Sequence, residues 1–407
     1  MQQNTTVNKS FKVLAIVTIV TYLYLISRTV HLRGADDDQV FLSIFNSGNI
    51  IDLLVNRFNT WSGRFSLELL MTTTIGYSTF WKIGIPLSVT VVCYCCSKIA
   101  GYKSLVFPFT LAIFLFASIP DQINIDSSWW ITGFYNYLLP VAAALYVFKV
   151  CFLGGSSKVE KIICIILAFY FPYMEQAGLA FVVAMGCLIY SERKSISKFN
   201  VTVLILVGIN LIICLKAPGN ENRFALEAWR WYPQYQTYGI ANKLSLGFDK
   251  LHQLMTFKSN IPLIALMVSV FYVRCSYSRM TKSIKIALFL IATFIAISIA
   301  NSFTGFFSRG FFFNSTTIDA TRWSAAKLYI SYFYLFTVIS SVFIILIDCL
   351  LSNKSGLTPI VAMLIGFMTV TMLGLSPTVY ASGYRVDFVF EIMCIVSCMS
   401  LIKPSIK

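Results

Sequence analysis

Charged residues are scarce in this chain of 407 residues. Only 12% are Asp, Glu, Lys or Arg, whereas 57% are hydrophobic and the mean hydropathy is +0.75. A soluble domain would carry about a quarter charged residues, so the composition excludes a soluble protein. The apolar residues come in blocks of roughly 17–25, the length of helix that crosses a bilayer. A transmembrane β-barrel would show short alternating segments instead, and we therefore predict an all-α polytopic membrane protein.

Histidine is also scarce, and no cysteine pattern indicates a metal site. The only histidines are His31 and His252, which argues against histidine-based metal sites and histidine-dependent acyl transfer. The eleven cysteines fall in or at the ends of apolar segments, where we expect them to pack as small apolar side chains. The sequence has no glycine-rich phosphate loop and no soluble nucleotide-binding domain. We predict no metal site and no certain cofactor, although the carboxylates described below suit a divalent cation.

The net charge of +15 has a topological explanation. Many of the basic residues lie in short loops that would face the cytoplasm, as membrane topology requires, so we expect no nucleic-acid partner. Lys9 and Lys12 precede the first apolar segment and place the N-terminus in the cytoplasm. No small-residue cleavage site follows, so we expect this segment to be an anchor.

The apolar pattern predicts about ten to twelve transmembrane helices in one membrane domain, 1–407. No fixed-period repeat and no inverted repeat of the transporter kind is visible. The predicted spans are 11–30, 81–100, 104–120, 131–153, 161–174, 177–191, 199–216, 259–277, 284–302, 326–350, 357–374 and 385–402.

Four longer segments are predicted to face outward. In the first, apolar side chains at helical spacing over residues 40–58, interrupted at Gly48, predict one or two helices in the membrane interface. Residues 65–77 add a further interfacial piece. The outward segments are 31–80, 216–258, 301–325 and 375–384.

Three adjacent carboxylates, Asp36, Asp37 and Asp38, follow the first span directly. A carboxylate at a membrane surface can act as general base toward a sugar hydroxyl, and carboxylate oxygens also bind divalent cations. The alternative is a solvated acidic loop beside a span. The arginines of the outward segments favour the catalytic interpretation.

Lys and Arg are usually concentrated in cytoplasmic loops, so arginines in the outward segments need an explanation other than membrane topology. Their forked guanidinium groups suit a phosphate at the depth of the lipid headgroups. Contact with lipid headgroups is the alternative for any one of them. The candidates for binding a donor phosphate are Arg64, Arg223, Arg309, Arg322 and Arg385.

Aromatic and acidic side chains of the same segments are candidates for binding sugars. Tryptophan and tyrosine rings can stack on pyranose rings, although an aromatic belt at the membrane interface is the alternative explanation. An acid near a span is usually functional, whereas a structural hairpin tip is the alternative for Glu175. The substrate-binding candidates are Trp61, Glu68, Glu175, Trp229 and Trp231.

Four short motifs occur in a recognisable order. They are Asp37-Asp38-x-x-Phe41, WSGR at 61–64, Glu175-Gln176 and APGNENR at 217–223. Together with the layout of spans, this set resembles the GT-C glycosyltransferases. Within that group it is similar to the phage-encoded, serotype-converting O-antigen glucosyltransferases of enteric bacteria. Asp36 departs from the acidic pair of the family and leaves three candidates for the base, of which Asp37 matches the first acid of the pair.

The resemblance implies a reaction at the periplasmic face of the bacterial inner membrane. The donor would be undecaprenyl-phosphate glucose, and the acceptor a sugar of the O-antigen repeat. Asp37 would deprotonate the acceptor hydroxyl, with Asp38 and Asp36 as alternatives, and transfer would invert the anomeric centre. Arginines would stabilise the phosphate leaving group. The implied partners, besides the lipid bilayer, are a small flippase and a donor synthase.

Other functions share these features. A GT-C transferase that acts on lipid A or on a protein would use the same chemistry. A flippase for a lipid-linked glycan should place its ionisable groups between helices at mid-membrane, whereas here they are predicted to cluster outside. An O-antigen polymerase would carry similar arginine-bearing loops. The acids directly after the first span favour the transferase.

Overall fold

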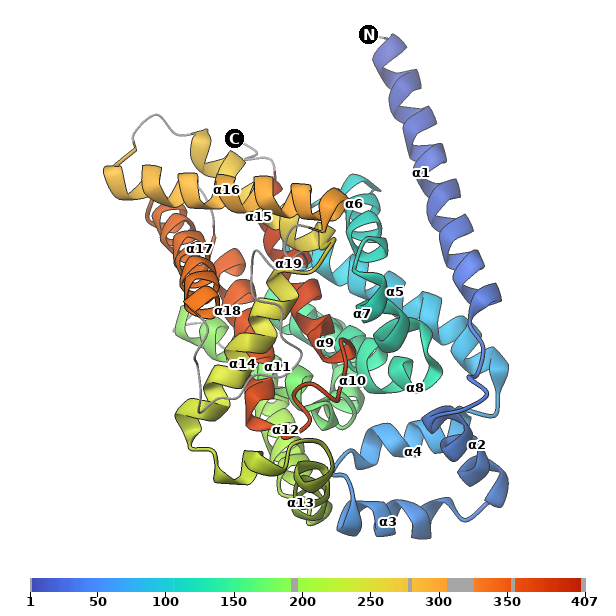
Figure 1. Ribbon diagram of the computed structural model, residues 1–407. Coiled ribbons are helices and arrows are strands. Elements are labelled where there is room, and N and C mark those ends of the chain that lie inside the picture. The colour runs from blue at the N-terminus through green and yellow to red at the C-terminus, as the bar shows by residue number, and fades with distance from the viewer. Residues whose placement is uncertain are drawn as a thin grey trace. The chain divides into compact units, whose positions relative to one another are not determined.

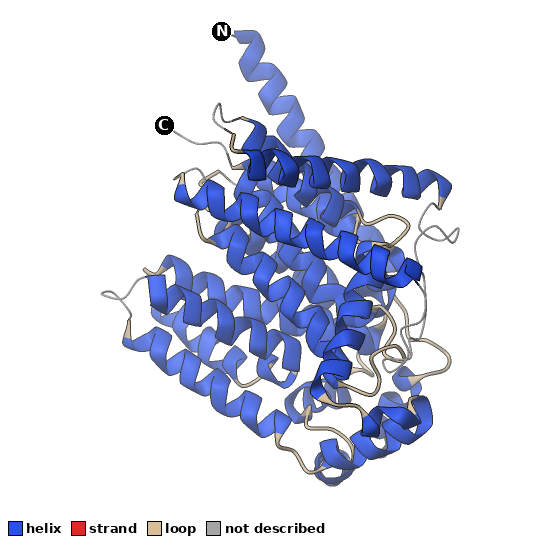
Figure 2. Ribbon diagram, turned by 60° about the vertical axis from the view of Figure 1, so that its left-hand side comes forward, coloured by secondary structure: helices blue, strands red, loops and turns tan. Residues whose placement is uncertain are grey.

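The fold is entirely helical over the residues that the structure describes. The computed structural model describes residues 2–104, 106–191, 197–276, 280–305, 326–352 and 356–403. Within these ranges the chain forms α-, 3-10 and π-helices and no strand (Figure 2). The structure therefore confirms the prediction of an all-α chain with several membrane-length helices.

The chain divides into two compact units. Unit 1 contains Met1–Ala117 and Asn124–Arg223, and unit 2 contains Ser118–Ile123 and Phe224–Lys407. Both units hold helices long and apolar enough to cross a bilayer. A single membrane domain over 1–407 therefore stays a prediction.

In unit 1, the long helices α5 (Ser78–Ile99) and α9 (Leu139–Leu153) pack against each other (Figure 1). The first helix, α1 (Gln2–Thr29), packs on α5. Three short helices between them in sequence contact one another: α2 (Asp37–Ser47), α3 (Ile50–Thr60) and α4 (Phe65–Thr74). The other long elements of the unit are α6 (Val106–Ala117), α10 (Lys158–Ala168), α11 (Glu175–Ser191) and α12 (Lys198–Leu215).

In unit 2, α15 (Ile261–Cys275) and α18 (Thr358–Thr371) both pack on α19 (Phe388–Ile402). The helices α16 (Lys282–Thr304) and α17 (Ala326–Leu351) form a second packed pair. The amphipathic helix α14 (Ile240–Met255) packs on the 3-10 turn Met372–Leu375. Two further 3-10 turns of this unit are Pro233–Thr237 and Arg385–Asp387. The helices α7 (Asp121–Asn124) and α13 (Gly219–Trp231) contain residues of both units.

Helix length corrects the predicted number of spans. In the described parts of the chain, seven helices are long and apolar enough to cross a membrane. The number is eight if the bent pair Val106–Ala117 and Asp121–Trp129 forms one span. A helix of 15 residues is about 22 Å long, whereas the apolar core of a bilayer is about 30 Å thick. Four of the predicted spans form α-helices of only 11 to 17 residues and are not among these seven or eight: 161–174, 177–191, 259–277 and 385–402.

The first outward segment folds as the apolar spacing predicts. Gly48 ends α2 with a left-handed backbone, φ 73°, which glycine adopts without steric cost. The chain then re-enters a helix at Ile50, and α4 is the further piece predicted over 65–77. Two helices separated at Gly48 are therefore confirmed, while their place in the membrane interface stays a prediction.

Two glycines allow α14 to pack closely on the chain after α18. A Cβ atom on Gly247 would lie 2.0 Å from the carbonyl oxygen of Thr371. A Cβ atom on Gly374 would lie 2.1 Å from the carbonyl oxygen of Lys243. Both obstacles are backbone atoms inside packed elements, so a larger residue at either position would separate the two segments.

We predict that Gly247→Ala destabilises the protein by about 1–3 kcal/mol, because the new methyl group overlaps a backbone oxygen. Gly208→Ala, in the interior of α12, is the matched control, since nothing lies within 4 Å of its added Cβ. Alanine favours a helix over glycine, so this control should be neutral or slightly stabilising. Thermal unfolding of the purified protein in detergent measures both effects. Equal Tm values for the two variants would contradict the close packing.

Candidate functional site

The three adjacent carboxylates occupy different environments in unit 1. Asp36 and Asp37 are exposed at the start of α2, whereas Asp38 is fully buried. Asp36 has φ 75° and ψ −166°, and no other non-glycine residue in the described ranges has a positive φ. This backbone region suits glycine alone, costs about 1–3 kcal/mol for other residues, and is found preferentially at functional sites. The strained turn therefore marks the segment 33–39, called the acidic segment below, as a candidate site.

Hydrogen bonds occupy both carboxylate oxygens of Asp38. Its Oδ1 accepts from the backbone N–H of Thr132 at 2.9 Å and from the Thr132 hydroxyl at 2.6 Å. Its Oδ2 accepts from the backbone N–H of Arg33 at 2.9 Å. Three such donors compensate for the loss of hydration of a buried carboxylate. Because these bonds engage both oxygens, the geometry favours the exposed Asp37 over Asp38 as a base.

Arg57 provides a positive charge close to Asp37. Its guanidinium donates to Glu68 twice, from Nε to Oε2 at 2.8 Å and from Nη2 to Oε1 at 2.9 Å. Burial would lower the pKa of Arg57, but the hydrogen bonds and charge of Glu68, with the charge of Asp37, raise it. The Arg57 guanidinium also lies 5.2 Å from the ring centre of Phe41. Since Glu68 is buried and engaged by Arg57, a direct contact with a substrate would require this pair to open.

A second ion pair joins two of the four sequence motifs. Arg64 of the WSGR motif donates from Nε to Glu175 Oε1 at 3.2 Å and from Nη2 to Oε2 at 2.8 Å. Burial would lower the pKa of Arg64, but the charge of Glu175 raises it above its ordinary value. The pair uses two of the five guanidinium N–H groups, which leaves others for a phosphate. The predicted phosphate ligand and the predicted substrate ligand are thus direct partners.

The WSGR motif also interlocks with the APGNENR motif. The backbone N–H of Gly63 donates to the Asn220 side-chain oxygen at 3.2 Å. A Cβ atom on Gly219 would lie 2.3 Å from the backbone nitrogen of Trp61, so glycine is required there. The Arg223 guanidinium lies 5.7 Å from the Trp61 ring centre. Three of the four motifs, far apart in sequence, therefore meet in unit 1.

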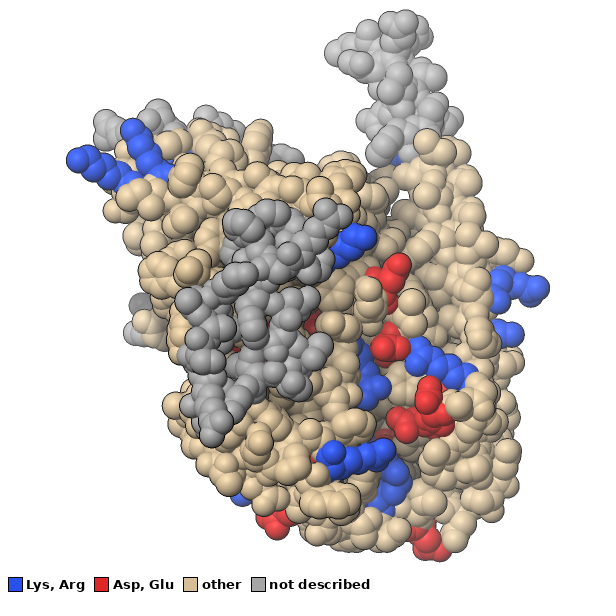
Figure 3. Space-filling model, in the orientation of Figure 1, with Lys and Arg blue, Asp and Glu red and all other residues tan. Residues whose placement is uncertain are grey.

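The other predicted site residues do not belong to this group. Trp229 and Trp231, 76% and 52% exposed, lie near the end of α13 in unit 2, and Arg385 opens a 3-10 turn of that unit. Arg309 and Arg322 lie outside the described residues. Charged side chains of both signs are exposed on the face drawn in Figure 3, among many uncharged ones. The predicted site residues within unit 1 are Asp36, Asp37, Asp38, Trp61, Arg64, Glu68, Glu175 and Arg223.

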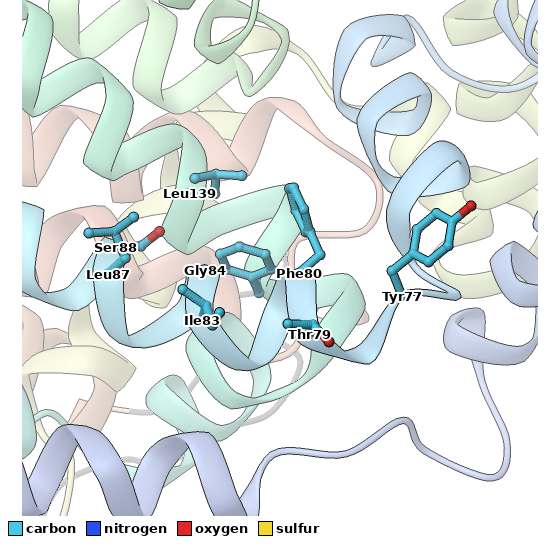
Figure 4. A pocket seen from close by; sticks show the side chains of 9 residues that line it. Tyr77, Thr79, Phe80, Ile83, Gly84, Leu87, Ser88 and Leu139 are labelled. Carbon is cyan, nitrogen blue, oxygen red and sulfur yellow. The ribbon is translucent and has the colours of Figure 1, made fainter.

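An apolar groove of about 570 Å³ runs along the first half of α5 (Figure 4). Ring stacking between Phe80 and Tyr135, with centres 6.0 Å apart, joins α5 to the π-helix Phe134–Leu138 beside the groove. Gly84 lets the Phe134 ring pack closely on α5, because a Cβ at this position would lie 3.0 Å from that ring. The lining includes Tyr77, Thr79, Phe80, Ile83, Leu87 and Leu139.

Unit 2 contains a buried polar network that the sequence analysis missed. Asp249 of α14 accepts from the hydroxyls of Tyr332 and Tyr380, the latter at 2.6 Å. The next residue, Lys250, donates to the Gly383 carbonyl at 2.9 Å and lies 3.4 Å from Asp387. Only Asp387 carries a signal in the sequence, because it lies in the predicted span 385–402, where an acid is costly. Asp249 and Lys250 lie in the polar outward segment 216–258, where charged residues are expected.

His252 belongs to the same buried network and binds the Ser331 hydroxyl at 2.5 Å. Burial lowers the pKa of His252 to about 4, whereas burial raises the pKa of Asp249 to about 6. The folded protein therefore keeps the imidazole neutral at pH values where a hydrated histidine would be charged.

Comparison with known proteins yields no match: no family model, no curated protein and no solved structure is similar to this chain. Over the described residues, no group of three or more His, Cys, Asp or Glu side chains is arranged to hold a metal ion. The case for a function therefore depends on the contacts described above.

We predict that His252 makes the protein less stable as the pH falls from about 6.5 to 4. Its pKa is lower in the folded than in the unfolded chain, so its contribution is complete above pH 6.5 and is lost as the pH falls through about 4. Asp249 has the opposite sign, and its contribution is lost as the pH rises through about 6. Comparing Tm values of wild type and His252→Gln over pH 4–7 cancels the Asp249 contribution. A Tm difference independent of pH would contradict the buried neutral imidazole.

Proposed function

We propose that the protein transfers a glucosyl residue from undecaprenyl-phosphate glucose to a sugar of the O-antigen repeat. Transfer would take place at the periplasmic face of a bacterial inner membrane. The observation that carries this proposal is the connection, within unit 1, between the apolar groove on α5 and the exposed acid at the start of α2.

One end of the groove is Tyr77, whose ring contacts the ring of Phe45 at a centre distance of 5.2 Å. Phe45 lies on α2, which begins at Asp37. Phe45 lies eight positions after Asp37 along α2, a rise of about 12 Å. A polyprenyl-phosphate sugar has an apolar chain at one end and a phosphate and a sugar at the other. A lipid chain in the groove would therefore place its phosphate and sugar near the acidic end of α2.

In the proposed reaction, the Asp37 carboxylate accepts the proton of an acceptor hydroxyl. The acceptor oxygen forms a bond to the anomeric carbon of glucose, and the bond from that carbon to the phosphate oxygen breaks. The bonding electrons leave with undecaprenyl phosphate, and the anomeric configuration inverts. Positioned base catalysis of this kind contributes about 10²–10⁴-fold to a rate.

Arginines would stabilise the phosphate as it gains charge. Arg64 and Arg223 belong to the interlocked motifs, so their backbones are held by the close contacts of Gly63 and Gly219. Arg64 retains donors beyond its pair with Glu175. These contacts support Arg64 and Arg223 as the donor-phosphate ligands in unit 1.

One observation favours a second candidate, a flippase for a lipid-linked glycan. Transporters place ionisable groups between helices, and unit 2 buries Asp249, Lys250 and Asp387 in this way. The two functions differ in their response to mutation. Loss of the exposed Asp37 should disable a transferase and leave a flippase active.

We predict that Asp37→Asn lowers glucosyl transfer by about 10²–10⁴-fold, because an amide cannot accept the proton. The gene would be expressed in a strain of known O-antigen with the donor supply verified. The linkages of its polysaccharide would then be compared with those of the parent strain. The variant should accumulate in the membrane like wild type, because Asp37 is exposed.

The matched control is Asp36→Gly, which removes the neighbouring acid and fits the positive φ of that position. It should retain transfer and be slightly more stable than wild type. Transfer by Asp37→Asn at the wild-type level would exclude Asp37 as the base. An unchanged polysaccharide in the presence of the wild-type protein would argue against O-antigen glucosylation altogether.

A further inference from the structure

We infer that the segment Asp126–Gly133 is a cradle that positions the catalytic end of α2. The inference rests on the proposed function, because it gives the cradle the task of holding Asp37 in place. None of the cradle residues was among the candidates taken from the sequence. Asp126, Trp130 and Thr132 all contact the acidic segment within unit 1.

Arg33 and Asp38 are the two residues of the acidic segment that the cradle holds. The Arg33 guanidinium donates from Nη2 to Asp126 Oδ1 at 2.8 Å and lies 4.9 Å from the ring centre of Trp130. Thr132 gives Asp38 two hydrogen bonds, from its backbone and its hydroxyl. The acidic segment is thus fixed before and at the start of α2 by residues about ninety positions further along the chain.

The cradle is itself a tightly folded turn. A π-helix, Ile125–Trp129, closes with a hydrogen bond from the Trp130 N–H to the Ile125 carbonyl at 2.8 Å. A Cβ atom on Gly133 would lie 2.1 Å from the carbonyl oxygen of Asp126, so the two ends of the cradle nearly touch. A second π-helix, Phe134–Leu138, follows directly. Such π-helical turns are rare and are found frequently at functional sites.

Hydrogen bonds also link residues within the acidic segment. Both backbone polar groups of Arg33 are engaged by side chains, since its N–H donates to Asp38 and its carbonyl accepts from Gln39 at 2.6 Å. The Gln39 N–H donates to the Asp36 carbonyl at 3.2 Å. This closure fits the positive φ of Asp36, which turns the chain sharply into α2.

Fixing Asp38 also fixes the direction of its neighbour. Consecutive residues of an α-helix are about 100° apart around the axis. When the Asp38 side chain is directed inward to Thr132, the adjacent Asp37 side chain is directed toward the exposed side. Thr132 is therefore a positioning residue for Asp37 and needs no contact with a substrate.

The test combines transfer kinetics with hydrogen exchange on the purified full-length protein. Thr132→Val removes the hydroxyl donor and keeps side-chain shape, while Thr132→Ser restores the donor. Thr73→Val is the matched control, because Thr73 is an exposed residue of α4 whose hydroxyl bonds only the Leu69 and Leu70 carbonyls of its own helix. Arg33→Gln tests the outer contact of the cradle in case Thr132→Val does not fold.

For Thr132→Val we expect kcat to fall about 10²-fold with donor KM little changed, because a shift of about 1 Å in a catalytic group has this effect. Amide exchange in α2 should rise about tenfold with the loss of one charge-assisted hydrogen bond. Thr132→Ser should recover both properties, Thr73→Val should change neither, and Arg33→Gln should lower kcat to a lesser extent.

A folded Thr132→Val protein with wild-type kcat would overturn the inference while leaving the proposed function intact. Unchanged kcat in folded Arg33→Gln protein would overturn it where Thr132→Val does not fold. If the wild-type protein transfers no sugar, the proposed function fails first, and exchange in α2 then tests the cradle alone. Unchanged exchange in Thr132→Val would overturn the cradle in that case too.

Discussion

A carboxylate removed from water is costly unless donors surround it, and the arrangement of unit 1 depends on how Asp38 meets this requirement. Its donors are the N–H and hydroxyl of Thr132 and the N–H of Arg33, at 2.6–2.9 Å. These bonds fasten α2 to a segment about ninety residues away. They also leave Asp37, one residue earlier, exposed. The hydrogen bonds of Asp38 thus make it a buried structural acid and leave the adjacent Asp37 accessible.

Two further ion pairs extend this organisation. Arg57 with Glu68 joins α3 to α4, and Arg64 with Glu175 joins α4's N-cap to the start of α11. A partly buried bidentate pair holds a fixed geometry, because the planar guanidinium makes two hydrogen bonds to the two oxygens of the carboxylate. The short helices after the first span are therefore supported on charged contacts as well as on apolar ones. Such support suits a site that must hold a polar headgroup beside a membrane.

The sequence predicted features that depend on local composition and spacing. The helical character and the break at Gly48 both came from short stretches of residues, and the acids and WSGR were selected as site candidates in the same way. It failed where a partner lies far away in the chain. Asp38 and Thr132 are 94 positions apart and Arg64 and Glu175 are 111 apart, so their pairing is a property of the tertiary fold. Neighbouring acids that look alike in sequence consequently differ in burial and in hydrogen bonding.

Span counting failed for a different physical reason. Apolar composition alone does not say where a helix stops, and Pro172 and Asn260 lie at helix ends inside segments that hydropathy treated as continuous. The buried network of Asp249, Lys250 and His252 was missed because α14 reads as a polar interfacial helix. Only its packing on the turn after α18 shows that these groups are buried.

Reconstitution would show whether unit 1 catalyses transfer from a lipid-phosphate sugar. The purified protein would be placed in liposomes with radiolabelled undecaprenyl-phosphate glucose and an O-antigen acceptor. We expect labelled glucose on the acceptor in inverted configuration, with one undecaprenyl phosphate released for each glucose transferred. Movement of the labelled donor between leaflets without any new glucosidic bond would exclude the proposed transferase.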